Sequence, residues 1–206
     1  MARPRLISDD QILGMMRTCV LEHGPAVSLD TVAERLHVTG PALLKRFGTR
    51  KELLLRALRP PDDPPILTDL ARGPDSRSLE DQLVSHFSRA WEFFAEVIPC
   101  ISALRESGVT HQEIMNNGTI GPARLVNAVT GWLKQAKNQG LVESKTLESV
   151  ATAMLGALQV RVFTAHVLRD PESARSQREY IRDIARLFAR ALLPPMGSKP
   201  RAAQAR

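Results

Sequence analysis

Residues 28–58 read SLDTVAERLHVTGPALLKRFGTRKELLLRAL, and the spacing within this stretch decides the fold. Apolar residues recur every three or four positions, and Ser28 stands where a helix N-cap is expected. A tight break over residues 37–40 separates two short helices, and Pro41 suits the first turn of the second because its missing N–H would be unpaired there. Two short helices joined by a turn that contains Gly predict a helix-turn-helix.

A longer helix is predicted in front of this pair and another behind it. Capping-box spacing before an apolar face predicts a helix over residues 9–23. The same spacing from Thr49 to Glu52 opens a fourth helix, which closes before the prolines of residues 60–65. We therefore expect a helix-turn-helix domain over residues 1–59.

The positive charge of the chain lies mainly at its two ends. The formal net charge is +6, with +4 over residues 1–60, −1 over residues 61–193 and +3 over residues 194–206. Between residues 38 and 59 a group of cations faces a single acid, Glu52. A cluster of this kind predicts a phosphate-binding surface, although composition alone leaves open a solvated helix face. These cations are Lys45, Arg46, Arg50, Lys51, Arg56 and Arg59.

Double-stranded operator DNA is the partner that the motif predicts. The second helix of a helix-turn-helix enters the major groove with its N-terminal end first, so the residues around Thr39 are expected near base edges. Cations further along that helix are expected to reach flanking phosphates. Arg3 and Arg5 precede the first helix and are either minor-groove contacts or part of a plain basic terminus. The candidate DNA-contacting residues are Arg3, Arg5, Ser28, Thr39, Gly40, Pro41, Ala42, Leu44, Lys45, Arg46, Thr49 and Arg50.

Residues 8–58 resemble the TetR family of transcriptional regulators in spacing and residue type together. The resemblance implies an all-α fold, with an N-terminal three-helix helix-turn-helix domain and a larger helical-bundle domain for ligand sensing and dimerisation. The matching positions are Val32, Ala33, Val38, Leu43, Phe47, Thr49, Arg50, Leu53 and Leu54.

The chain also departs from the pattern of this family. Leu44 stands where the family usually has a Tyr that contacts a phosphate, so that hydroxyl is lost here. Arg46 stands where His is common, and Gly40 where a longer polar residue often reads a base. Arg50 replaces the usual Lys and keeps the cation in a planar fork that suits a phosphate.

The rest of the chain is predicted to be helical as well. Residues 59–77 are rich in proline and form the internal linker candidate. Ser78 caps a long helix that Pro99 is expected to kink into a further helix ending near Gly108, followed by an irregular stretch. Further helices are predicted over residues 122–138, 146–168 and 174–193, which completes a second domain over residues 60–193, and residues 194–206 are predicted to be a disordered basic tail.

The helix predicted over residues 146–168 is apolar on nearly all sides, and such a helix must be covered all round. In TetR-like proteins the final two helices pair with those of a second copy, so a homodimer through residues 146–168 and 174–193 is expected. A dimer also supplies the two recognition helices that a pseudo-palindromic operator requires. A monomer with a fully internal helix is the alternative.

The second domain is expected to bind a small, largely apolar effector. Aromatic and sulfur-containing side chains from several of its helices are candidates to line a pocket, although each of them could be an ordinary core residue. His86 and His166 are further polar groups within these helices. The candidate ligand-lining residues are Phe87, Trp91, Phe94, Cys100, Met115, Trp132, Met154, Gln159 and Phe163.

Other classes of protein have less support. The chain has no Gly-rich phosphate loop and no HExxH motif, and its five His and two Cys lack metal-ligand spacing, so we expect no enzyme, metal or cofactor. The first ten residues turn acidic and no run approaches the roughly 18 apolar residues of a membrane span, so a cytoplasmic protein is expected. A helical interaction protein without specific DNA binding remains the alternative function, and a redox role for Cys100 remains open.

Overall fold

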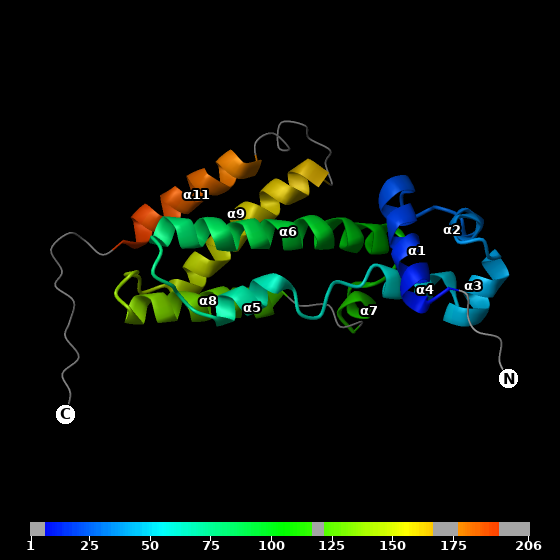
Figure 1. Cartoon of the computed structure of the whole chain (residues 1–206), viewed down its shortest axis with the longest axis horizontal. Coiled ribbons are helices and arrows are strands. Elements are labelled where there is room, and N and C mark those ends of the chain that lie inside the picture. Colours follow the sequence, from blue (N-terminus) through cyan, green and yellow to red (C-terminus); the bar gives the residue numbers. More distant parts are fainter. Residues whose placement is uncertain (1–6, 117–121, 167–176, 194–206) are drawn as a thin grey trace, which may run out of the picture. The chain divides into compact units, whose positions relative to one another are not determined.

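The computed structural model describes residues 7–116, 122–166 and 177–193, and every element in these ranges is a helix (Figure 1). The predictions for Arg3, Arg5 and residues 194–206 therefore lie outside the described residues. The described helices are α1 (Asp9–His23), α2 (Leu29–Arg35), α3 (Gly40–Phe47), α4 (Arg50–Ala57), α5 (Pro65–Ala71), α6 (Leu79–Glu106), α7 (His111–Asn116), α8 (Pro122–Asn138), α9 (Leu147–His166) and α11 (Gln177–Leu192).

The first four helices begin where the sequence predicts them to begin. Ser8 and Thr49 each form a complete capping box at the start of α1 and α4. The side chains of Ser28 and Thr39 accept hydrogen bonds from the N–H groups of Thr31 and Ala42. Each cap satisfies backbone donors that the first helical turn leaves without partners, which is why these boundaries can be read locally.

The chain divides into two compact units. The first comprises Met1–Asp62 and Glu96–Ile120, and the second comprises Asp63–Ala95 and Gly121–Arg206. The end of α6 and α7 thus belong to the same unit as the helix-turn-helix. The domains expected over residues 1–59 and 60–193 stay a prediction.

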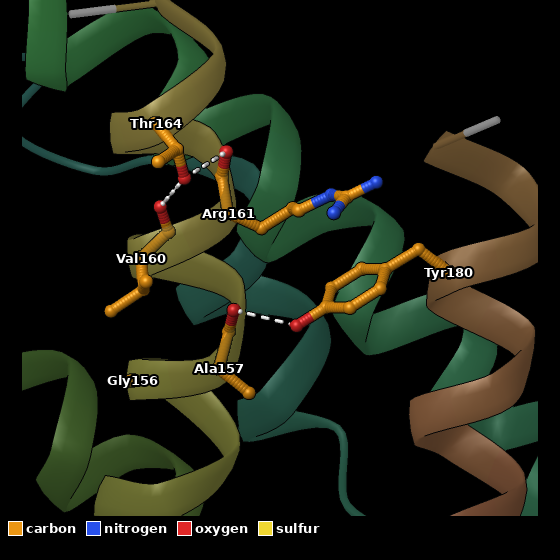
Figure 2. Close-up of a pocket in the computed structure, with 6 residues that line it drawn as sticks. All are labelled: Gly156, Ala157, Val160, Arg161, Thr164 and Tyr180. Atoms are coloured by element: carbon orange, nitrogen blue, oxygen red, sulfur yellow. Dashed lines mark hydrogen bonds between the residues drawn. The ribbon is translucent and has the colours of Figure 1, made fainter. Parts of the chain in front are cut away.

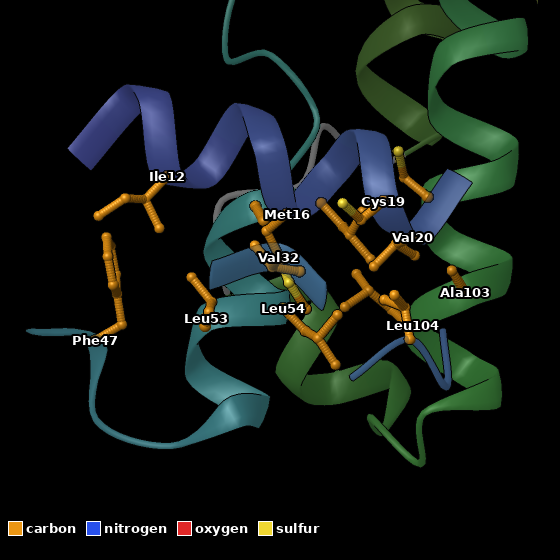
Figure 3. Close-up of a cluster of buried hydrophobic side chains, with 14 of the residues drawn as sticks. Ile12, Met16, Cys19, Val20, Val32, Phe47, Leu53, Leu54, Ala103 and Leu104 are labelled. Carbon is orange, nitrogen blue, oxygen red and sulfur yellow. The ribbon is translucent and has the colours of Figure 1, made fainter. Parts of the chain in front are cut away.

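One apolar cluster forms the core of the first unit (Figure 3). Met16 and Cys19 of α1 are fully buried, and Val32 of α2 and Leu53 of α4 lie in the same cluster. The last part of α6 adds Cys100, Ala103 and Leu104 to it. The helix-turn-helix is thus held by a core that includes residues from far along the chain.

The second unit packs α5 against α8 and α8 against α9. Two aromatic contacts join α6 to α11: the rings of Phe87 and Phe188 lie 6.1 Å apart, and those of Trp91 and Tyr180 lie 6.3 Å apart. Trp132 of α8 is 1% exposed. Large side chains from at least four helices therefore share one interior.

Three segments differ from the sequence-based expectation. The proline-rich segment 59–77 is not a plain linker, because it contains α5, which buries Ile66 and Leu70. Pro99 does not divide its region into two helices, since α6 continues from Leu79 to Glu106. The stretch expected to be irregular contains α7, which buries Ile114.

Candidate functional site

The helix-turn-helix presents the first turn of α3 to solvent. Pro41, Ala42, Leu44 and Lys45 are exposed, while Leu43 is buried with Phe47 in the core. The apolar side of α3 therefore anchors the helix, and its other side is open to a partner. This is the arrangement by which a recognition helix is held at the surface for a DNA groove.

The turn before α3 depends on two backbone features. His37 has a φ of 54°, which places a non-glycine residue in the left-handed region. Gly40 is buried, and a Cβ built there would lie 2.7 Å from Oδ1 of Asp30. Gly40 thus leaves room for the Asp30 carboxylate, and its missing side chain faces α2, away from the exposed side of the helix.

Arg46 is attached to the start of α1. Its Nη1 donates a hydrogen bond to the carbonyl of Ile7 at 2.7 Å, and its Nη2 forms an ion pair with Asp9. The side chain is only 19% exposed, and its guanidinium lies 5.9 Å from the centre of the Phe47 ring. In this structure Arg46 ties the end of α3 to α1, so a phosphate contact by Arg46 would require these bonds to be exchanged.

Arg50 is attached to the segment between α1 and α2. Its Nη2 donates to the carbonyl oxygens of Pro25 and Val27, the latter at 3.0 Å. Both carbonyls belong to the loop that leads into the helix-turn-helix. The guanidinium of Arg50 therefore holds that loop against α4.

The remaining cations of the cluster differ in their surroundings. Lys51 donates to Glu113 at 2.6 Å, and this ion pair, with the hydroxyl and N–H of Thr110, lowers the pKa of Glu113 to about 2. Arg56 lies over the Phe47 ring, and Arg59 pairs with Asp62. Within the described residues, neither Arg56 nor Lys45 has a hydrogen-bond or ion-pair partner, and of these two it is Lys45 that also has no ring contact. Its exposed ammonium is free to reach a phosphate.

The second unit contains a small closed cavity of about 20 Å³. A ligand of several carbon atoms does not fit a space that holds about one water molecule, so the cavity would have to widen to admit one. The Nε1 donor of Trp132 is buried and has no hydrogen-bond partner among the described residues. The cavity is lined by Ile66, Leu70, Leu83, His86, Phe87, Ala90, Val129, Trp132, Met154 and Leu155.

The structure brings together only part of the predicted ligand-lining set. Phe87, Trp132 and Met154 line the cavity, whereas Trp91 and Phe94 are buried elsewhere in the same unit. Gln159 is exposed and Phe163 is 43% exposed. Their place on the outer side of α9 gives them no part in this cavity.

Cys100 and Met115 belong to the first unit, whereas the other predicted ligand-lining residues belong to the second. Cys100 is completely buried in the core, where it accepts a hydrogen bond from Nη2 of Arg17 at 3.3 Å. Burial raises the pKa of its thiol, although Arg17 acts in the opposite direction. A buried thiol of raised pKa is a poor nucleophile, which argues against the redox role.

Comparisons with known proteins rest on structure. No family model and no curated protein matches the chain. A protein from Mesorhizobium loti described as a TetR-family transcriptional regulator matches with a TM-score of 0.69 at 13% identity, over 90% of this chain and 96% of that one. TetR transcriptional regulators from Streptomyces coelicolor (TM-score 0.53, 20% identity, 91% of this chain and 99% of that one) and Legionella pneumophila (0.56, 13%, 88% and 99%) also match.

This chain has the TetR-family fold. The match confirms the predicted all-α architecture of a helix-turn-helix followed by a larger helical bundle. Leu44 is one of the positions at which the sequence departs from the family pattern, and its side chain is 37% exposed on the open side of α3.

Apolar side chains are also exposed on the last helices of this TetR-fold chain. Val160 and Phe163 of α9 and Leu187 of α11 are 66%, 43% and 64% exposed. A hollow of about 470 Å³ lies between α9 and Tyr180, whose hydroxyl donates to the carbonyl of Ala157 at 2.9 Å (Figure 2). Side chains of this kind on a free surface indicate a covering partner.

Two further observations concern membrane-spanning helices and metal sites. None of the helices in the described ranges is both long and apolar enough to cross a membrane. In the same ranges, no group of three or more His, Cys, Asp or Glu side chains is placed to hold a metal ion.

Proposed function

We propose that the protein is a sequence-specific DNA-binding transcriptional repressor, which a small, largely apolar effector releases from its operator. The observation that carries this proposal is the exposed first turn of α3. Thr39 caps that turn, Leu43 and Phe47 fix the helix from behind, and Lys45 extends beside it without a partner among the described residues. A rigid helix end with a free cation is suited to a major groove and its flanking phosphates.

The working form is a homodimer that pairs α9 and α11 with those of a second copy. Exposed Val160, Phe163 and Leu187 support this arrangement, because burying them removes apolar surface from water. Two copies related by a two-fold axis read two half-sites of a pseudo-palindromic operator. Ser28, Pro41, Ala42 and Lys45 belong to the proposed DNA-contacting surface, and Arg46 and Arg50 join it only by exchanging their present partners.

The effector would act through the second unit. A ligand lowers the affinity for DNA only if it binds the DNA-free conformation more tightly, and a coupling of about 1 to 3 kcal/mol gives roughly 5- to 150-fold release. The buried Trp132 donor and the apolar wall around it supply such a site once the cavity widens.

Selection from a randomised duplex library tests DNA binding without knowledge of the operator. The full-length protein is expected to enrich an inverted repeat whose half-sites lie about one helical turn apart. Ala42→Glu should abolish this enrichment without unfolding the chain, since Ala42 is exposed and the new carboxylate would face phosphates. Ala123→Glu, at an exposed position of α8, is the matched control and should select the same repeat as the unaltered chain.

A helical interaction protein without specific DNA binding is the second candidate, favoured by the exposed apolar residues of α9 and α11 alone. It predicts that the protein is folded but enriches no DNA sequence from the library. It also predicts that Ala42→Glu and Ala123→Glu behave alike. Either result would overturn the repressor proposal.

A further inference from the structure

The exposed side of α3 begins with apolar side chains. Pro41, Ala42 and Leu44 are exposed there, and Leu44 is 37% exposed. Residues three positions apart lie on the same face of a helix, so Pro41 and Leu44 form one stripe with Ala42 beside it. This apolar stripe offers methyl and methylene groups at the end of the helix that would meet the base edges.

The polar side chains around the apolar stripe are few, and most of them have partners. Oγ1 of Thr39 accepts a hydrogen bond from the N–H of Ala42 at 3.3 Å, which leaves one hydroxyl hydrogen to donate. Arg46 is held on α1 by a backbone carbonyl and a carboxylate. Across residues 40–47, all of which the structure describes, α3 therefore carries no exposed carboxamide and no free guanidinium. The ammonium of Lys45 is the remaining donor, and it can reach either a phosphate or a guanine.

Apolar side chains can still distinguish one feature of the major groove. Among the four standard bases, thymine alone places a methyl group there, on its C5 atom. Contact between this methyl group and an aliphatic side chain removes the apolar surface of both from water. Thymine is thus the base whose edge complements the apolar stripe.

We propose that Leu44 is a specificity-determining residue, which packs on the C5 methyl group of a thymine in each half-site, with Pro41 and Ala42 beside it. The proposal rests on the DNA-binding part of the function proposed above and names the feature of the operator that α3 recognises. Leu43 and Phe47 are buried in the core and fix the helix, so the apolar stripe is already in place before DNA binds. Methyl contacts then supply sequence preference, and the surrounding cations supply affinity that does not depend on sequence.

Deoxyuridine tests this contact because it keeps every hydrogen-bonding group of thymine and lacks only the methyl group. Selection from the randomised library first gives the operator, in which we expect a thymine at a fixed position of each half-site. Replacing that thymine by deoxyuridine should weaken binding of the full-length protein about fourfold in one half-site and roughly sixteenfold in both, since a buried methyl-sized group contributes about 0.8 kcal/mol. The same replacement outside the half-sites is the control and should leave the affinity unchanged.

Leu44→Ala tests which side chain makes the contact. The variant should bind the thymine operator more weakly and lose most of its preference for thymine over deoxyuridine, because the methyl group has lost its partner. Lys45→Ala is the matched control in the same helix, and it should weaken binding to both duplexes alike and keep the preference. A merely structural role for Leu44 predicts that Leu44→Ala also weakens binding to both duplexes alike.

The proposal fails if the selected half-sites contain no thymine at a fixed position, if deoxyuridine is bound as tightly as thymine, or if Leu44→Ala keeps the full preference. A protein that enriches no sequence would reject the repressor and this proposal together. An enriched inverted repeat whose binding does not depend on the methyl group would reject the role of Leu44 alone.

Discussion

Lys45 and Arg50 carry the same charge within one helix-turn-helix but lie in different surroundings. Lys45 is exposed at the end of α3, whereas Arg50 donates to two backbone carbonyls of the loop before α2. The sequence predicts a phosphate contact for both because it shows only charge and spacing. The structure shows that Arg50 also makes hydrogen bonds within the fold.

Lys45→Ala should weaken DNA binding and leave the free energy of unfolding unchanged. Each phosphate contact releases about one counterion, so the slope of log affinity against log salt concentration should flatten by about one unit. Affinity for the selected duplex, measured over a range of salt concentrations, gives this slope. An unchanged slope would remove Lys45 from the phosphate-contacting residues.

Arg50→Ala should destabilise the first unit by about 1 to 3 kcal/mol, because the carbonyls of Pro25 and Val27 lose a charged donor. Urea unfolding followed by circular dichroism measures the loss, with Lys45→Ala as the matched control. The Arg50 prediction would be wrong if both variants unfolded at the same urea concentration as the unaltered chain. The salt slope of Arg50→Ala then tests separately whether this residue also contacts phosphate.

The helix α6 contains a proline at the point where the chain passes between its two units. Pro99 has no N–H, so it cannot donate to the carbonyl of Ala95 as other residues of a helix interior do. The division between the two units falls between Ala95 and Glu96. The backbone hydrogen bond that Pro99 cannot donate to Ala95 would therefore have spanned this division.

Pro99→Ala should raise the free energy of unfolding by about 1 to 3 kcal/mol, because it restores a helical hydrogen bond and removes a steric conflict. Urea unfolding is the measurement. Ser102→Ala in the same helix is the control, and its expected gain is about 0.5 kcal/mol or less from helix propensity alone. A Pro99→Ala protein no more stable than the control would show that α6 already accommodates the proline without cost.

Helix boundaries were predictable where the signal is local. Ser8, Ser28, Thr39 and Thr49 all act as caps, because a cap needs only the side chain and the next three residues. By contrast, α5 could not be read from its sequence. Pro64 precedes it and Pro65 is its first residue, and its seven residues are too few to form a stable helix alone, so packing of α5 on α8 must stabilise it.

The candidate sites were predictable to a smaller extent for a related reason. Helical spacing placed Pro41 and Ala42 on the exposed side of α3, but it did not show that Arg46 turns back onto Ile7 and Asp9. Arg72 and Arg89 belong to different segments of the chain, so helical spacing did not show that both of them pair with Asp69. Contacts between distant parts of a chain depend on tertiary packing, which the periodicity of apolar residues along the sequence does not predict.

The proposed mechanism requires a dimer, and the exposed apolar residues of α9 and α11 support a contact with a second copy there. Helical spacing places Phe188 on the apolar side of the last helix, but its ring packs on Phe87 within one chain. A charge at Phe188 would therefore disrupt the unit itself. Val160 and Leu187 are better probes, because their side chains are 66% and 64% exposed in the single chain.

The double variant Val160→Glu and Leu187→Glu should convert the dimer into a folded monomer. Two added carboxylates per copy would face each other across the two-fold axis, and desolvating them would outweigh the apolar contacts that they replace. Sedimentation velocity at micromolar concentration gives the association state, and circular dichroism confirms that the helices persist. Leu21→Glu, at a leucine of α1 that is 49% exposed, is the control and should remain dimeric. Because one recognition helix contacts only a half-site, the monomer should also lose the inverted repeat in DNA selection. A wild-type chain that sediments as a monomer, or a double variant that stays dimeric, would place the dimer contact elsewhere or remove it, and the two-half-site operator would lose its structural basis.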